Sequence, residues 1–299
     1  MKKTLSILLL LACAASAAHA QSAVTATFSD IILGFSATNS ANGAGSDKNL
    51  EINLGNVGHY YNLPANTTLN LGNLRADLES VYDLVWNSRD DLTWGLIGTT
   101  GSATGTTLNT ATGSVSIAAK TVWGGKAETT AGVQTTSYNR ATTFTQQNAA
   151  NTIATLYTGA VGSFVPLTGT RSSTVNDSRA TVIDNTLAGS WSNKEGTNSS
   201  AFGFFSKTLF EASTNFTTIA GSFAVIDLFE LQPGSGAGVY RGSFALNSDG
   251  LLQFSNNAAT FALSAVPEPS AYAVLLGALA LGGAALRRRK VVPAAASTV

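Results

Sequence analysis

The 299-residue chain carries seventeen Lys and Arg against seventeen Asp and Glu, with one cysteine and two histidines. Six of the basic residues lie in positions 2–3 and 287–290, so residues 21–265 have a net charge of about −5. A segment with this charge and no basic run has no electrostatic reason to bind nucleic acid or anionic lipid, and its abundance of Thr, Ser, Asn and Gly favours strands over helices.

Residues 1–20 have the pattern of an export signal. Lys2-Lys3 precedes an apolar run at 5–15, and Ala18-His19-Ala20 fits the small-x-small rule for signal peptidase cleavage before Gln21. Cys13 offers an alternative interpretation as a lipoprotein acceptor, but the apolar region before it then has only about nine residues, at the short end for a signal. Cleavage after Ala20 leaves a chain without cysteine, which forms no disulfide and no thiolate metal site.

Residues 21–265 are expected to form one exported β-rich domain, a β-sandwich or barrel-like fold with one or two helices. Apolar residues alternate with polar ones in several segments, as half-buried strands require. The predicted strands include residues 24–28, 31–35, 50–54, 92–96, 115–119, 202–204, 223–225 and 229–231. A hairpin is predicted to join 244–246 to 252–254, because Asp249-Gly250 supplies the positive φ of a tight turn.

Two segments favour helices. In residues 73–86, Leu74, Leu78, Val81 and Val85 recur at helical spacing behind Asn73, a suitable N-terminal cap. A weaker pattern covers residues 146–157. Residues 98–113 between them are almost wholly Thr, Gly, Ser and Ala, so we expect an extended loop.

The candidate catalytic and metal-ligating residues are few. His59 is the only histidine after export and has no Gly-x-Ser-x-Gly nucleophile motif to serve, so neither a catalytic triad nor a zinc site is expected. Asn42-Gly43-Ala44-Gly45-Ser46-Asp47 resembles half of a calcium-binding nonapeptide repeat but has no second copy. Asp90-Asp91 is a second calcium candidate, although adjacent carboxylates in a turn are usually solvated.

Carbohydrate chemistry leaves a weaker signature. A glycosidase needs two neighbouring carboxylates, and sequence spacing does not reveal such a pair. Asp227 stands out because it interrupts an apolar strand, where a buried carboxylate needs a partner such as Arg. Asp77, Glu79 and Asp83 fit the polar face of the first predicted helix. The four tryptophans, Trp86, Trp94, Trp123 and Trp191, are candidates for stacking on sugar rings, but large aromatics in β proteins are more often core residues.

The C-terminal region carries the most specific signal in the chain. Val266-Pro267-Glu268-Pro269-Ser270 is followed by an uncharged segment, 271–286, and then by Arg287, Arg288, Arg289 and Lys290. At 1.5 Å per residue the segment extends about 24 Å as a helix, near the lower limit for a transmembrane span. The cations hold its far end on the cytoplasmic side.

These three parts together resemble the PEP-CTERM sorting signal of Gram-negative bacteria. The resemblance covers residues 266–290 and implies recognition by the membrane protease exosortase at or near Pro267, Glu268 and Pro269, cleavage, and delivery from the inner membrane to the cell surface or extracellular matrix. Such systems accompany biofilm and extracellular polysaccharide production. Residues 291–299 extend past the usual end of the signal, and we expect a disordered tail. Segments 49–55, 86–95 and 246–254 look similar to uncharacterised passengers that precede this signal, which implies no activity.

The sequence thus predicts a non-enzymatic, cofactor-free surface or matrix protein that acts by adhesion or by association with extracellular polysaccharide. Its predicted processing partners are signal peptidase and exosortase. The alternative is a secreted carbohydrate-active enzyme with an Asp/Glu pair. An ordinary anchor helix behind a Pro-rich linker is the alternative interpretation of residues 266–290.

Overall fold

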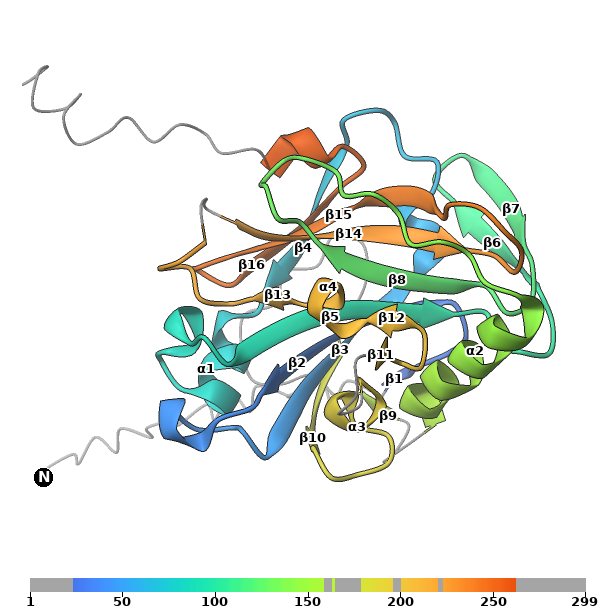
Figure 1. The fold of residues 1–299 in the computed structure, drawn as a ribbon. Helices are drawn as coiled ribbons and strands as arrows, with labels where there is room; N and C mark the ends of the chain where they lie inside the picture. The colour runs from blue at the N-terminus through green and yellow to red at the C-terminus, as the bar shows by residue number, and fades with distance from the viewer. Residues whose placement is uncertain (1–23, 159–162, 165–178, 196–199, 220–222, 262–299) are drawn as a thin grey trace, which may run out of the picture.

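The computed structural model describes residues 24–158, 163–164, 179–195, 200–219 and 223–261. These residues form a mainly β structure built on one strongly curled ten-stranded sheet (Figure 1). Its strands are β2 (Asp30–Ala37), β3 (Lys48–Asn56), β4 (Thr68–Asn73), β5 (Leu92–Thr99), β8 (Val122–Ala127), β10 (Arg179–Asp184), β13 (Ala212–Ser213), β14 (Phe223–Leu231), β15 (Val239–Asn247) and β16 (Leu251–Ser255).

Short elements surround this sheet. The two-stranded pairs are β1 (Val24–Thr25) with β9 (Ser163–Phe164), β6 (Thr106–Thr110) with β7 (Gly113–Ile117), and β11 (Ser200–Ala201) with β12 (Phe205–Ser206). The α-helices are α1 (Arg75–Tyr82), α2 (Thr143–Thr158), α3 (Trp191–Glu195) and α4 (Lys207–Phe210). The 3₁₀ turns are η1 (Ser40–Asn42), η2 (Val57–Tyr60), η3 (Trp86–Ser88) and η4 (Ala258–Phe261).

The order of the sheet joins segments that are far apart in the sequence. The strands run β10-β3-β2-β5-β8-β14-β15-β16-β4, and β13 pairs with part of β5. All described pairings within it are antiparallel. The edge strand β4 therefore pairs with β16, where Leu252 lies opposite Gly72. The opposite edge is β10, which pairs with β3.

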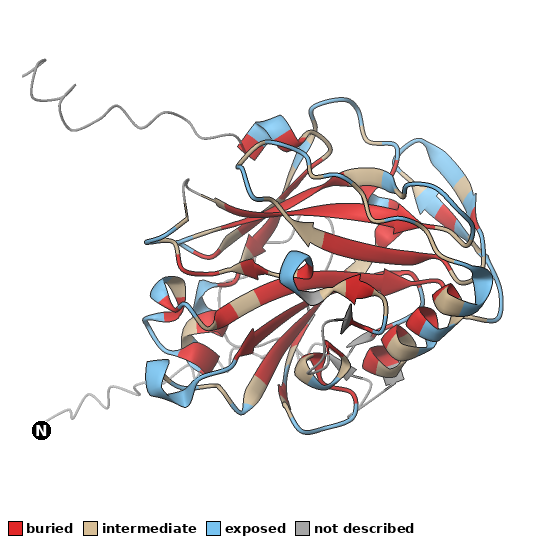
Figure 2. Ribbon diagram, in the orientation of Figure 1, coloured by how far each residue is buried: buried red, intermediate tan, exposed pale blue. Residues whose placement is uncertain are grey.

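Both faces of the sheet are covered, which explains why its central strands are buried along their whole length (Figure 2). On β2, Leu33 and Phe35 face a core that includes α1, η2 and the β6–β7 hairpin, whereas Ile32 faces a second core that includes α2, α3 and α4. Because both faces are covered, even the polar face of β3 is buried. Its residues Asn49, Glu51 and Asn53 are at most 3 % exposed.

Aromatic rings lie directly on glycines of the second face. Gly34 and Gly95 pair across β2 and β5, and the Trp191 indole covers both. A Cβ at position 34 would lie 1.9 Å from Cδ2 of Trp191, and one at Gly124 would lie 2.3 Å from the Phe205 ring. These glycines are required because no larger residue leaves room for the rings.

Most expected strands are confirmed. β2, β3, β5, β7, β15 and β16 include or overlap the predicted segments, and Gly250 at the hairpin turn has φ +81°. The two segments 223–225 and 229–231 belong to the single strand β14. Both predicted helices are present, as α1 and α2, and the Asn73 side chain accepts from the Arg75 backbone N–H at 2.9 Å. The first is shorter than the predicted 73–86: it ends at Tyr82, Asp83 has φ +64°, and Val85 is 48 % exposed.

Four expectations are wrong in detail. Residues 98–113 include the end of β5 and the strand β6, because Thr suits a pleated strand and Leu108 supplies a buried anchor. Residues 202–204 form the turn between β11 and β12, with Phe202 at φ +51°. The alternation at 24–28 yields only the two-residue β1, and Phe28 is 53 % exposed. The described residues also contain four α-helices rather than one or two.

Candidate functional site

The predicted targeting residues lie outside the described part of the chain. This applies to Ala18, Ala20 and Gln21 of the signal peptidase site, to the sorting tripeptide at 267–269 and to the basic cluster at 287–290. Within the described ranges, no helix has the length and apolarity that crossing a bilayer requires.

Phe261, the last described residue, lies six residues before the predicted sorting tripeptide. Phe261 is 3 % exposed and packs with Val225, Ala245 and Phe223, its ring centroid 5.5 Å from that of Phe223. The turn η4 that carries it is held by the hydrogen bond from the Thr260 backbone N–H to the Asn257 carbonyl, at 3.0 Å. The last described residue is thus anchored in the domain.

A surface of uncharged residues, most of them polar, adjoins this end. We call residues 62–68 and 256–260 the closing surface. Its two segments are joined by side-chain amides: the Thr67 backbone N–H donates to Asn256 Oδ1 at 3.0 Å, Asn256 Nδ2 donates to the Pro64 carbonyl at 2.7 Å, and Asn257 Nδ2 donates to Asn66 Oδ1 at 2.7 Å. None of its twelve residues is charged.

Asp227 is fully buried, as its place in an apolar strand suggests, but its partner is not an arginine. Its Oδ2 accepts from the backbone N–H and the hydroxyl of Thr135, at 2.5 and 2.9 Å. Its Oδ1 accepts from the Ser243 hydroxyl at 2.6 Å. The expected Arg partner is replaced by neutral donors, and both carboxylate oxygens are occupied.

Glu128, which the sequence did not single out, lies beside this carboxylate. Its burial and the neighbouring Asp227 charge raise the Glu128 pKa to about 8. Oε2 accepts from the Gly132 backbone N–H at 2.8 Å. This is a pair of acids close in space, the feature that a glycosidase needs, but its Asp227 member is inaccessible to a substrate.

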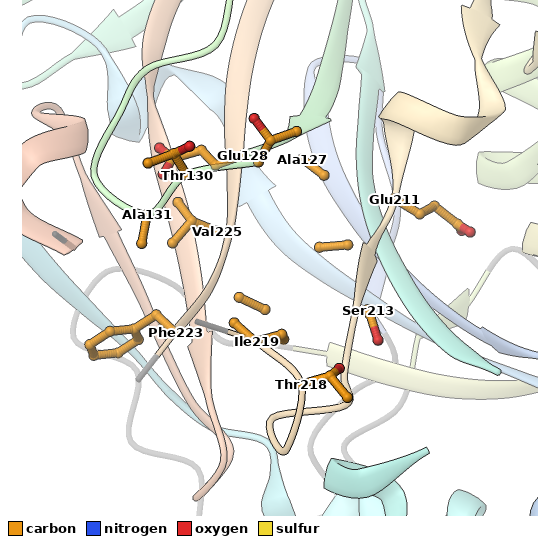
Figure 3. A pocket seen from close by; sticks show the side chains of 13 residues that line it. Ala127, Glu128, Thr130, Ala131, Glu211, Ser213, Thr218, Ile219, Phe223 and Val225 are labelled. Carbon is orange, nitrogen blue, oxygen red and sulfur yellow. The ribbon is translucent and has the colours of Figure 1, made fainter. Parts of the chain in front are cut away.

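A pocket of about 550 Å³ adjoins Glu128, between β13 and the start of β14 (Figure 3). Its apolar lining includes Ile219, Phe223 and Val225. Glu211 also lines it, but Figure 3 shows its side chain pointing away from the other lining groups, and its oxygens accept from Trp191 Nε1 and Thr93 Oγ1, both at 2.7 Å. The pocket therefore does not present two converging free carboxylates.

Glu230 has the arginine partner that Asp227 lacks. Its Oε2 accepts from Arg241 Nε at 2.7 Å and from Arg241 Nη2, and also from the Tyr61 hydroxyl at 2.5 Å. Trp123 Nε1 donates to that hydroxyl at 2.7 Å, and the Arg241 guanidinium lies 4.2 Å from the centroid of the Tyr61 ring. A buried charge with this many partners stabilises the interior and is not free for catalysis.

Arg89 binds residues of both calcium candidates, the segment 42–47 and the pair Asp90-Asp91. Arg89, 3 % exposed, donates to the Ala44 carbonyl at 2.5 Å and to both oxygens of Asp91, at 2.8 and 3.1 Å. Asp90 accepts from Asn215 Nδ2 at 2.5 Å. The expectation that both aspartates are merely solvated is wrong, because each carboxylate is bound to protein. Among the described residues, no three His, Cys, Asp or Glu side chains form a metal-binding group.

The remaining candidates divide between interior and surface. All four tryptophans are at most 1 % exposed, so they are core residues and are unavailable for stacking on sugars. His59 lies exposed in η2, and Asp77 is buried rather than on a solvated helix face. Glu79 pairs with Arg75 at 2.6 Å, and Asp83 accepts from the Ala44 backbone N–H at 3.0 Å.

Sequence reasoning missed Glu51, Glu128 and Glu211, because each looks like an ordinary polar residue of an amphipathic strand or loop. Glu51 carried one usable signal: it lies between Leu50 and Ile52 in a strand whose flanking polar residues are uncharged asparagines. Comparison of this chain with family models, with curated proteins and with solved structures gives no match.

Proposed function

We propose that the chain is an exported cell-surface or extracellular-matrix protein. In this proposal signal peptidase removes residues 1–20, residues 271–286 span the inner membrane transiently as a helix, and exosortase cleaves at or near Pro267-Glu268-Pro269. The domain at 21–265 is the delivered cargo.

The observation that carries this proposal is the order of features at the C-terminal end. The described fold closes at the anchored Phe261, and the tripeptide, the uncharged segment and four cations then follow in sequence. A protease substrate needs an accessible, extended site outside the folded domain, and two prolines favour extended backbone at this point. An export pattern at residues 1–20 supports the same route.

The cargo itself is proposed to act without catalysis, by adhesion or association with extracellular polysaccharide. The state of its carboxylates supports this. Asp227 and Glu230 are buried with their hydrogen bonds satisfied, and Asp90 is bound to Asn215. Because these carboxylates are already hydrogen-bonded within the protein, their state also weighs against the alternative, a secreted carbohydrate-active enzyme.

The sorting proposal is tested by fractionating cells that express wild type or Glu268→Ala, with and without exosortase. We expect wild-type cargo in the medium or on the surface only when exosortase is present, and full-length Glu268→Ala in the inner membrane of both strains. Equal release in all four cultures would mean that residues 266–290 are only an anchor.

The non-catalytic proposal is tested on purified cargo with Glu128→Gln as the matched variant. We expect wild type and variant to bind to the host's extracellular polysaccharide equally and to release no reducing sugar. Release of reducing sugar by wild type that Glu128→Gln abolishes would establish the enzyme instead.

A further inference from the structure

We infer that the closing surface, residues 62–68 and 256–260, contacts the membrane-embedded protease while the precursor is being cleaved. This inference rests on the proposed function and adds the face of the cargo that meets the enzyme. It starts from a fixed point, since Phe261 is buried against Val225 and Ala245 and so moves with the domain.

The tether between that point and the cleavage motif is short. Six residue steps separate Phe261 from Pro267, and a fully extended chain of that length spans about 20 Å at most. A globular domain of this size has a radius of gyration of roughly 18 Å. A protease cleft binds several residues of an extended substrate around the scissile bond. Almost no free chain then remains between the enzyme and the domain, so the end that carries Phe261 must face the enzyme.

The composition of this end suits such a contact. The passenger has a net charge of about −5, yet none of the residues at 62–68 or 256–260 is charged. Charged groups are depleted at the centres of protein interfaces because their desolvation is costly. Uncharged amides instead offer hydrogen bonds without that penalty, and here they are already fixed in place by the pairing of Asn256 with Pro64 and of Asn257 with Asn66. The surface is therefore preorganised as well as neutral.

The chain offers a matched pair of exposed alanines for the test. Ala259 lies in η4 on the closing surface, and Ala188 lies in the loop that follows β10, the edge strand at the opposite end of the sheet from β4. Ala259→Arg places a bulky charge on the proposed contact, and Ala188→Arg places the same charge elsewhere. Both purified cargo variants should retain the wild-type unfolding midpoint, which excludes misfolding as the cause of any effect.

The measurement is the rate at which cargo is released from the membrane in a pulse-chase experiment with exosortase present. We expect Ala259→Arg to slow release about tenfold, as a misplaced interface charge does, and Ala188→Arg to leave it unchanged. A third variant carries about eight additional Gly/Ser residues between Phe261 and Ala262, which add roughly 16 Å of mean reach. This insertion should return Ala259→Arg to within about twofold of the wild-type rate, since the domain can then withdraw.

Release of Ala259→Arg at the wild-type rate, or slow release that the insertion does not repair, would overturn the inference. So would binding of purified cargo to phosphatidylglycerol vesicles that Ala259→Arg alters, because the surface would then be a lipid contact. Failure of the sorting proposal itself gives a different result, namely wild-type release that does not depend on exosortase.

Discussion

Glu51 allows a quantitative test of how a buried carboxyl group makes the stability of this fold depend on pH. It has no solvent exposure, and burial raises its pKa from 4.5 to about 8, against the opposing hydrogen bond that Oε1 accepts from the Trp191 backbone N–H at 2.6 Å. Oε2 has no partner. The folded state therefore binds a proton more tightly than the unfolded state does. Proton binding by Glu51 therefore stabilises the fold at pH below 4.5, and this contribution to the free energy of unfolding is lost as the pH rises toward 8.

The size of the effect follows from the two pKa values. Between pH 5 and pH 8 the linkage relation gives a loss of about 3–4 kcal/mol in the free energy of unfolding from this one carboxyl group. Glu51→Gln keeps the shape and the acceptor oxygen but does not ionise. We therefore expect the free energy of unfolding of the variant to fall by about 3–4 kcal/mol less than that of wild type over this range. Glu128, whose pKa is also raised to about 8, contributes to both proteins and cancels in the difference.

The assay is urea denaturation of purified cargo at pH 5 and pH 8, followed by tryptophan fluorescence. Asp249→Asn is the control, because Asp249 lies exposed in the β15–β16 turn, and it should keep the wild-type pH dependence. An equal pH dependence in Glu51→Gln and wild type would refute the reasoning and show that Glu51 is ionised in the fold without penalty.

Three further predictions concern packing, acid and reagents. Gly34→Ala should cost about 2–4 kcal/mol by calorimetry because its Cβ meets Trp191, and the cost should largely vanish in a Trp191→Ala background; equal costs in both backgrounds would exclude this clash. Burial disfavours the Asp91 charge, but hydrogen bonds led by Arg89 outweigh it and lower the Asp91 pKa, so its stabilisation is present above pH 4 and is lost on further acidification. Asp91→Asn should destabilise the cargo by about 1–3 kcal/mol at pH 6 in urea titrations and by progressively less as the pH falls below 4, and a constant difference would contradict this. The melting temperature of mature cargo should not respond to reductant or a zinc-selective chelator, and a decrease with either would reveal a missed crosslink or metal.

The sequence predicted the β-rich class, the β15–β16 hairpin and both longer helices, because each depends on local periodicity or turn chemistry. It did not predict burial of the second sheet face. The alternation Asn49, Glu51, Asn53 indicates a solvated face, but elements from distant parts of the chain, α3 among them, cover that face. The partners of Asp227 were equally hidden, since Thr135 and Ser243 reach it from segments 92 and 16 residues away.

The edge strand β4 has a consequence for when this cargo folds. Its partner β16 lies about 180 residues later, and β16 is the last strand of the described sheet. Contacts between residues so distant in sequence form slowly, because a long loop must close before they stabilise anything. The sheet therefore stays incomplete while most of the chain is being synthesised. The export route proposed above requires an unfolded chain, and slow completion of the sheet suits that requirement.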